Sequence, residues 1–176
     1  GIATQTREHV AIARRLGNTV VLDTRKTLPG YRFLAKEAVV LGGGQNHRMG
    51  LHDMVMIKDN HIDAAGGIPQ AVAMVRKRWG AAYRIEVECR ALDEVRQALD
   101  LQVEVVMLDN MDEQAALAAL RLRQTGYPGT ITRFEASGDM NPEKLERFAG
   151  LGLDYISIGR LTHSVMAANF SLQIRR

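Results

Sequence analysis

The sequence predicts an α/β fold, namely an incomplete, TIM-barrel-like (β/α) barrel with six or seven parallel strands. Short apolar runs rich in β-branched residues alternate with segments of helical periodicity, and the ends of successive runs lie about 21 to 35 residues apart. Such alternation predicts parallel strands joined by right-handed crossovers. Polar residues follow each run at its carboxyl end, which is where a (β/α) barrel assembles its active site.

The expected elements follow in chain order, beginning inside a helix-like segment. The apolar runs expected to form strands are 19–22, 54–57, 82–87, 103–108, 130–134 and 155–158. The helical segments between them are 28–41, 68–79, 92–99, 113–122 and 142–148. Asn141 before Pro142 is a strong helix-start signal, and 170–174 is a candidate seventh strand. No linker divides the chain, so one barrel domain is expected over 1–176.

The polar residues at the strand ends favour a barrel over a doubly wound sheet. All six runs supply them, whereas a doubly wound sheet would concentrate them at one switch point. No GxGxxG follows the first run, so the sequence does not indicate a dinucleotide site. The polar residues are Asp23 and Arg25, Lys58 and Asn60, Glu86 and Glu88, Asp109 and Asn110, Glu135 and Ser137, and Ser157 with Gly159.

The composition is typical of a soluble globular protein, with 46% hydrophobic and 24% charged residues. A net charge of +3 and 5% aromatic residues argue against nucleic acid as a partner. No apolar run approaches the ~20 residues of a membrane span, and the start lacks a signal-peptide pattern. The single cysteine, Cys89, allows no intramolecular disulfide and fits a cytoplasmic protein.

Residues 23–61 carry three cationic clusters, each next to an apolar run or a glycine tract. The clusters are Arg25 with Lys26, His47 with Arg48, and Lys58 with His61. Arginine can form two parallel bonds to a carboxylate or phosphate, and lysine acts as a point charge. Their summed field predicts a partly desolvated pocket for a substrate with several negative charges. We expect His47 to contact substrate and His61 to have a structural role.

Three carboxylates are expected to converge in the same mouth. Glu86 and Glu88 lie two apart in a strand and therefore share one face, and Asp109 ends the next strand. These acids could bind Mg²⁺ with waters, stabilise a cationic transition state or form a general acid–base pair. For Glu86, neutralising a neighbouring arginine or lysine is a further alternative.

The last two strands predict a phosphate site. The segments Glu135–Gly138 and Ser157–Gly159 bring small residues and backbone N–H groups to adjacent strand ends, and His163 follows closely. In barrels, the loops after the last strands commonly bind phosphate in this way. A zinc site is not indicated, because no cysteine or histidine pair has ligand spacing.

These motifs resemble the quinolinate phosphoribosyltransferase family, also called nicotinate-nucleotide pyrophosphorylase (carboxylating), over essentially the whole chain. The motifs are GIAT at 1–4, DTRKTLPGYR at 23–32, GGGQNHRMGLHD at 42–53, IKDNHI at 57–62, IEVE at 85–88, LDN at 108–110, EASG at 135–138 and DYISIGRLTHS at 154–164. The resemblance implies the barrel domain of an enzyme of NAD biosynthesis. It would convert quinolinate and phosphoribosyl pyrophosphate to nicotinate mononucleotide, CO₂ and pyrophosphate with Mg²⁺.

The resemblance also implies roles for individual residues. The quinolinate carboxylates would be bound by Arg25, His47, Arg48 and Lys58, with Lys26 adding positive field. The acids Glu88 and Asp109 would bind the ribose hydroxyls and Mg²⁺, and together with Lys58 they are the expected catalytic residues. The 5′-phosphate would be bound by Ser137, Gly138, Gly159 and His163.

Some features depart from the family pattern. The family's N-terminal domain of roughly a hundred residues, which supplies another arginine and caps the partner's barrel in a homodimer, is not in this sequence. Asn169 stands where aspartate is usual, and 101–103 replaces a Gly-Ala-Asp turn. We therefore expect the isolated chain to be weakly active or inactive.

Three alternatives remain open from the sequence. A molybdenum-transport-associated homologue of the same fold shares the TRKT and HR motifs, although the IKDNH and LDN motifs favour the phosphoribosyltransferase. A Schiff-base aldolase would use Lys58 as its nucleophile. A non-catalytic barrel that binds phosphate and lacks its cap domain is the third.

Overall fold

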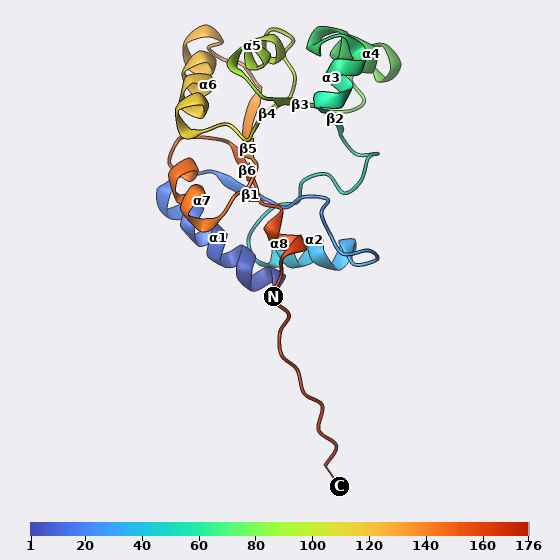
Figure 1. Cartoon of the computed structure of the whole chain (residues 1–176), viewed down its shortest axis with the longest axis vertical. Coiled ribbons are helices and arrows are strands. Elements are labelled where there is room, and N and C mark those ends of the chain that lie inside the picture. The colour runs from blue at the N-terminus through green and yellow to red at the C-terminus, as the bar shows by residue number, and fades with distance from the viewer. Residues whose placement is uncertain (176) are drawn as a thin grey trace.

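The computed structural model describes residues 1–175, which form one parallel six-stranded sheet surrounded by helices (Figure 1). The strands are β1 (Val20–Leu22), β2 (Val55–Ile57), β3 (Ile85–Cys89), β4 (Val105–Asp109), β5 (Arg133–Ser137) and β6 (Tyr155–Ser157). Their order in the sheet is β1-β6-β5-β4-β3-β2, so β1 and β2 are the edges of an incomplete barrel. The predicted fold class is confirmed.

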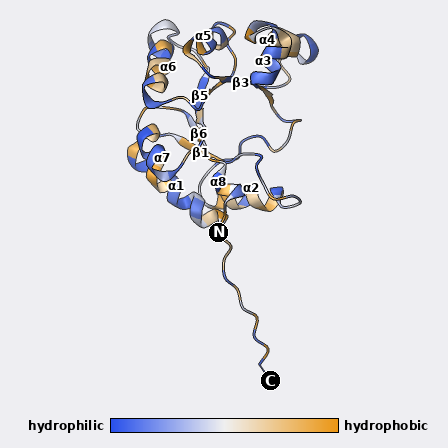
Figure 2. Cartoon of the chain, in the orientation of Figure 1, coloured by the Kyte–Doolittle hydropathy of each residue, from blue (hydrophilic) through white to orange (hydrophobic). Residues whose placement is uncertain are grey.

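The helices are α1 (Ile2–Leu16), α2 (Arg32–Leu41), α3 (Asp59–Ala65), α4 (Ile68–Trp79), α5 (Leu92–Asp100), α6 (Glu113–Gly126), α7 (Pro142–Ala149) and α8 (Arg160–His163). All five helical segments predicted between the strands are present, and α1 accounts for the helix-like start. Along each longer helix, hydrophilic and hydrophobic residues alternate (Figure 2). This pattern suits helices that cover a sheet on one side and meet solvent on the other.

Local sequence signals explain where two helices begin. The side chain of Asn141 accepts a hydrogen bond from the Lys144 N–H at 2.8 Å, and Pro142 occupies the first turn of α7. Asp112 caps α6 in the same way through the Ala115 N–H, also at 2.8 Å. The Asp112 cap was not predicted from the sequence, although an aspartate directly before a helical segment is a recognised signal of a helix start.

The hydrophobic core lies between the sheet and its helices. Val87, Val106, Phe134 and Ile156, on four neighbouring strands, are fully buried. All five residues of β3 are buried, as is typical of strands covered on both faces. No described helix is both long and apolar enough to cross a membrane.

The structure corrects two details of the predicted strands. Residues 170–174 are extended but pair with no strand among the described residues, and Phe170 and Leu172 are more than 90% exposed. The fifth strand begins at Arg133, because Thr130 and Thr132 bond to one another and Thr132 Oγ1 donates to the Val103 carbonyl at 2.7 Å. The candidate seventh strand is therefore not part of the sheet described.

The parallel register brings the carboxyl ends of the strands to one edge. Glu88 in β3 pairs with Met107, and Asp109 in β4 pairs with Ser137 in β5. Leu22 in β1 is paired with Ser157 in β6. Polar residues that follow these strands in the sequence therefore face the same mouth, as the alternation predicted.

Candidate active site

A cavity of about 890 Å³ lies at the carboxyl ends of the strands. Its lining includes all eleven predicted site residues: Arg25, Lys26, His47, Arg48, Lys58, Glu88, Asp109, Ser137, Gly138, Gly159 and His163. The open side of the barrel is spanned by the segment after α2, since Gln45 forms a bridge with Leu22 of β1 before the chain reaches β2. This segment carries His47 and Arg48 into the gap between the edge strands.

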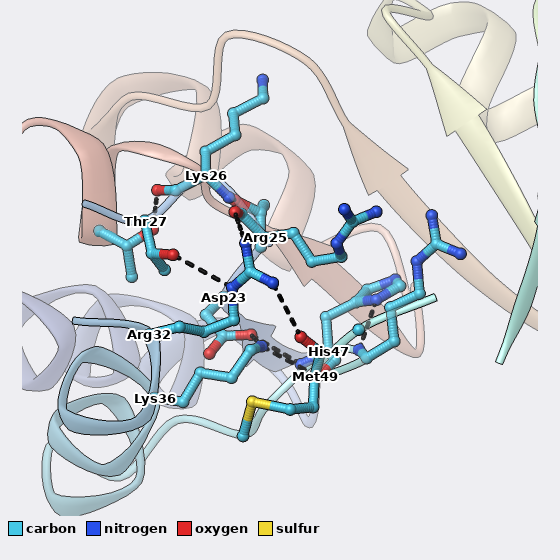
Figure 3. Close-up of polar contacts among 12 residues, drawn as sticks. Asp23, Arg25, Lys26, Thr27, Arg32, Lys36, His47 and Met49 are labelled. Carbon is cyan, nitrogen blue, oxygen red and sulfur yellow. Dashed lines mark hydrogen bonds and ion pairs between the residues drawn. The ribbon is translucent and has the colours of Figure 1, made fainter. Parts of the chain in front are cut away.

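Arg32 forms hydrogen bonds to both the loop that contains Arg25 and the loop that contains Arg48, and thereby links the two (Figure 3). Its guanidinium donates to Thr27 Oγ1 at 3.2 Å, to the Arg25 carbonyl at 3.2 Å and to the Met49 carbonyl at 3.4 Å. All three acceptors are uncharged, so the positive charge of Arg32 is not neutralised by them. Arg32 ends the DTRKTLPGYR motif, and no role for it was predicted from the sequence.

A buried ion pair holds the peptide of His47 in place (Figure 3). The Lys36 ammonium lies 2.6 Å from Asp23 Oδ1 and donates to the His47 carbonyl at 3.0 Å. The His47 N–H donates to the same Asp23 oxygen at 2.8 Å. Burial raises the pKa of Asp23, and the bonds from Lys36 and the His47 N–H oppose that shift.

The two ring nitrogens of His47 both face protein groups. Nδ1 accepts the backbone N–H of Arg48 at 2.7 Å, while Nε2 lies 3.0 Å from Glu86 and 3.5 Å from Glu135. Burial lowers the pKa of His47, but bonds to the two carboxylates raise it overall to about 10. The Arg48 N–H opposes this rise because it needs a lone pair on Nδ1. In either charge state, the proton on Nε2 remains.

Glu86 is not in the mouth, contrary to the expectation of three converging carboxylates. Its side chain is fully buried and faces a second cavity of about 220 Å³, which His47 separates from the larger one. Glu86 and Glu88 share a face of β3, but Glu86 lies one pleat deeper in the barrel. Its partner is the His47 imidazole, whereas the neutralising alternative expected a neighbouring arginine or lysine.

The cations facing the large cavity differ in their pairing. Lys58 Nζ lies 2.5 Å from Glu88 Oε2, so two predicted catalytic residues are paired with each other. Arg25, Lys26 and Arg48 have no carboxylate within ion-pair distance among residues 1–175. Burial and the charge of Arg25 lower the pKa of Arg48, which indicates that cations crowd this wall.

His61 has the structural role expected of it. Its Nδ1 accepts the backbone N–H of Lys58 at 3.0 Å and thereby caps the start of α3. This contact holds the backbone of Lys58 at the end of β2. The histidine itself does not line the large cavity.

The predicted phosphate end is shaped by glycine and by two contacts between loops. Gly138 has φ +104°, and a Cβ there would lie 2.1 Å from Asn110 Oδ1. Lys144 Nζ donates to the Gly138 carbonyl at 2.6 Å. Thr162 Oγ1 donates to the Lys26 carbonyl at 2.7 Å, which ties the Lys26 loop to α8.

Comparison with known proteins identifies the family. Residues 2–173 match the family described as quinolinate phosphoribosyl transferase, C-terminal domain. The chain belongs to this family. It is 48% identical to a probable nicotinate-nucleotide pyrophosphorylase (carboxylating) of Synechocystis over 89% of this chain and 52% of that protein. It is 43% identical to the protein of the same description from Bacillus subtilis over 99% of this chain and 58% of that one.

Solved structures of the quinolinate phosphoribosyl transferase family share the fold. The nicotinate-nucleotide pyrophosphorylase of Francisella tularensis superposes with a TM-score of 0.88 at 38% identity, over 94% of this chain and 57% of that one. NadC from Streptococcus pyogenes gives 0.86 at 40% identity, over 93% and 55%. The chain thus spans little more than half the length of these relatives.

The carboxylates of this family member offer oxygen ligands of the kind that Mg²⁺ prefers. Glu88 and Asp109 end adjacent strands and both line the large cavity. Among the described residues, the Asp109 carboxylate accepts a side-chain hydrogen bond from Asn110 alone, at 3.1 Å, whereas Glu88 is paired with Lys58. Asp109 is therefore the more accessible ligand, and Glu88 would have to exchange Lys58 for the metal.

Sequence reasoning missed several residues that shape this site. Glu135 had no predicted role of its own, yet it is buried beneath His47. Arg32 and Lys36 lie on α2, outside any strand end, and act through hydrogen bonds to distant backbone groups. The one available signal was a lysine on the buried side of an amphipathic helix, since lysine is almost never fully buried unless it is paired.

Proposed function

We propose that this chain is the catalytic barrel of an enzyme that joins quinolinate to the ribose of phosphoribosyl pyrophosphate. The products are nicotinate mononucleotide, CO₂ and pyrophosphate, in the biosynthesis of NAD. The observation that carries the proposal is one cavity whose lining combines unpaired cations, the carboxylates of Glu88, Asp109 and Asp139, and a glycine-rich end. The descriptions of the relatives, as pyrophosphorylases and as a quinolinate phosphoribosyltransferase, support the same activity and favour none of the alternatives.

The quinolinate dianion is bound at the cationic wall in this proposal. Arg25 and Arg48 face the cavity without a carboxylate partner, and Lys26 and Lys58 add charge. His47 forms the floor and contributes through its position rather than through a ring nitrogen, because both nitrogens already face protein groups. Two carboxylates on the ligand would satisfy guanidinium groups that otherwise face one another.

Phosphoribosyl pyrophosphate is placed across the rest of the cavity. Ser137, Gly138, Gly159 and His163 bind the 5′-phosphate, and Glu88 and Asp109 bind the ribose hydroxyls. These two acids also stabilise the positive charge that develops on the ribose carbon as pyrophosphate departs. Mg²⁺, held by Asp109 and Glu88 partly through water or substrate, would neutralise charge on the pyrophosphate.

The chemistry needs no organic cofactor. The pyridine nitrogen attacks the anomeric carbon as the bond to pyrophosphate breaks, and the ring becomes positively charged. The bond from the ring to the 2-carboxylate then breaks, its electrons enter the ring, and CO₂ leaves. A proton replaces the lost carboxylate to give nicotinate mononucleotide. The role of the chain is to orient the two anions and to stabilise the developing charges.

We also propose that another domain, or a second copy of this chain, packs against the barrel. Exposed apolar residues gather on α2 and the loops beside it: Leu28, Tyr31, Phe33, Leu34, Leu41 and Leu51. Such a face suits burial against another domain or a second copy, as in a homodimer. Cys89 is free and buried, which suits a reducing compartment such as the cytoplasm.

Calorimetry with quinolinate and nicotinate tests the proposed substrate. Nicotinate lacks the 2-carboxylate, and losing a charge-assisted contact in a desolvated site costs about 1.5–3 kcal/mol. We expect the full-length protein to bind quinolinate at least tenfold more tightly, and to form nicotinate mononucleotide with phosphoribosyl pyrophosphate and Mg²⁺. Equal affinities for the two acids, or no product, would contradict the proposal.

A further inference from the structure

A buried acidic pair lies directly beneath the floor of the active-site cavity. Atoms of His47, Glu86 and Glu135 all lie within 4.8 Å of one another, and Glu86 and Glu135 are 0% and 1% exposed. Both oxygens of Glu86, and Oε1 of Glu135, have no hydrogen-bond partner of normal geometry among residues 1–175. Burying two carboxylates with so few donors is costly. The cluster therefore calls for an explanation in terms of function.

The position of the His47 ring proton decides whether this cluster is a metal site or a set of groups that orients the imidazole. Because Nδ1 accepts the Arg48 N–H at 2.7 Å, its lone pair is occupied and the ring proton resides on Nε2. Nε2 itself lies 3.0 Å from Glu86 and 3.5 Å from Glu135. A metal ion bound at Nε2 would use the lone pair of that nitrogen, so the ring proton would have to move to Nδ1. A proton on Nδ1 would clash with the Arg48 N–H, which donates to the same atom. The donors thus favour an oriented imidazole over a metal centre.

The orientation of the His47 ring determines the position of the Arg48 backbone. The ring fixes the Arg48 N–H through Nδ1, and the guanidinium of Arg48 donates to the Met54 carbonyl at 3.1 Å and contacts Met56 Sδ at 3.6 Å. Arg48 lines both the large cavity and the smaller one that contains Glu86. The contacts form a continuous path from the buried acids, through the imidazole, to a cation of the binding wall.

We propose that Glu86 and Glu135 are positioning residues, which act through His47 to hold Arg48 in the geometry that binds a dicarboxylate. The consequence for the ligand rests on the proposed function, whereas the path itself does not. The acids touch neither the substrate nor the reacting atoms. Their effect is to keep Nε2–H directed into the barrel, so that the ring cannot turn and release the Arg48 backbone.

Glu86→Gln and Glu135→Gln test the proposal in the full-length protein, because both changes keep the shape of the side chain. Glu146→Gln on α7 is the matched control, since Glu146 is exposed and, within residues 1–175, pairs only with Arg15. We expect quinolinate affinity to fall about tenfold or more in each of the two buried variants, with the affinity for inorganic phosphate kept within twofold. Unchanged quinolinate affinity in both, or equal loss of both ligands, would overturn the proposal.

Nuclear magnetic resonance provides a readout that needs no substrate. In the unsubstituted protein, the Nε2 proton of His47 should give a low-field signal in slow exchange with water, assigned with a His47→Asn variant. That signal and the Arg48 amide signal should both move in the Glu86 and Glu135 variants and stay in place in Glu146→Gln. A rapidly exchanging Nε2 proton in the unsubstituted protein overturns the positioning role, even if a variant fails to fold. Absent quinolinate binding alongside the expected signals would instead count against the proposed substrate.

Discussion

Lys36 Nζ lies 2.6 Å from Asp23 Oδ1, and neither side chain is exposed to solvent. Between them these two residues bind both the N–H and the carbonyl of His47. The buried ion pair thus fixes the backbone position of His47, which precedes Arg48 in the cationic wall of the cavity. Replacing either residue should affect both stability and binding.

Lys36→Met leaves Asp23 buried without its cation. We expect the free energy of unfolding to fall by about 3–5 kcal/mol, because an uncompensated buried charge is left behind. Combining it with Asp23→Leu should recover part of that stability but not quinolinate affinity, since the His47 N–H then lacks its acceptor. Urea unfolding and calorimetry measure the two effects. Full recovery of binding in the double variant would show that the pair is only structural.

Lys58→Met removes the cation that is paired with Glu88. We expect quinolinate to bind more weakly, because the wall loses a charge, and Mg²⁺ to bind more tightly, because Glu88 is released. Titration calorimetry with each ligand measures these opposite changes. Lys77→Met on the exposed side of α4 is the matched control and should alter neither. Parallel weakening of both ligands would argue against competition between Lys58 and the metal.

Asp109→Ala tests the acidic side of the cavity. We expect turnover of the full-length enzyme to fall by about a hundredfold, as when a group that stabilises transition-state charge is removed. Quinolinate binding should change only a few-fold, because the acid lies apart from the cationic wall. Steady-state kinetics and calorimetry separate the two quantities, with exposed Asp93→Ala as control. Turnover preserved within a few-fold would make Asp109 structural.

Gly138→Ala tests the phosphate end of the cavity, and Gly129→Ala is its control. Both glycines have positive φ, +104° and +80°, but only at Gly138 would a Cβ meet a neighbour, Asn110 Oδ1 at 2.1 Å. Backbone strain of about 1–3 kcal/mol is expected in both variants. Loss of phosphate affinity is expected in Gly138→Ala alone, measured by calorimetry. A similar loss in the control would point to general destabilisation.

The fold was largely predictable because its signals are local. The alternation of apolar runs and helical segments located six strands and the helices between them, and Asn141–Pro142 marked the start of α7. The segment 170–174 has the composition of a strand, but whether it pairs depends on a neighbouring strand elsewhere. No such neighbour is present among the described residues. Composition alone could not decide this point.

The cavity lining was predictable for a related reason. Parallel strands place their carboxyl ends at one edge, so Lys58, Glu88 and Asp109 had to meet once the topology was known. Depth along a strand was harder to predict. Glu86 shares a face with Glu88, yet it lies beneath His47 instead of in the mouth. Periodicity gives the side of a strand, but burial depends on which loop covers it.

The sequence by itself determined the family, the order of the elements and the residue types gathered at the cavity. These features were predictable because the alternation of strands and helices and the family motifs depend on residues that are close together in the sequence. Only the tertiary structure decided how those residues are paired. Lys36 with Asp23, Lys58 with Glu88, and His47 with Glu86 and Glu135 each join separate elements. The strength of such pairs depends on distance and on exclusion from water, and both are set only when the elements pack together.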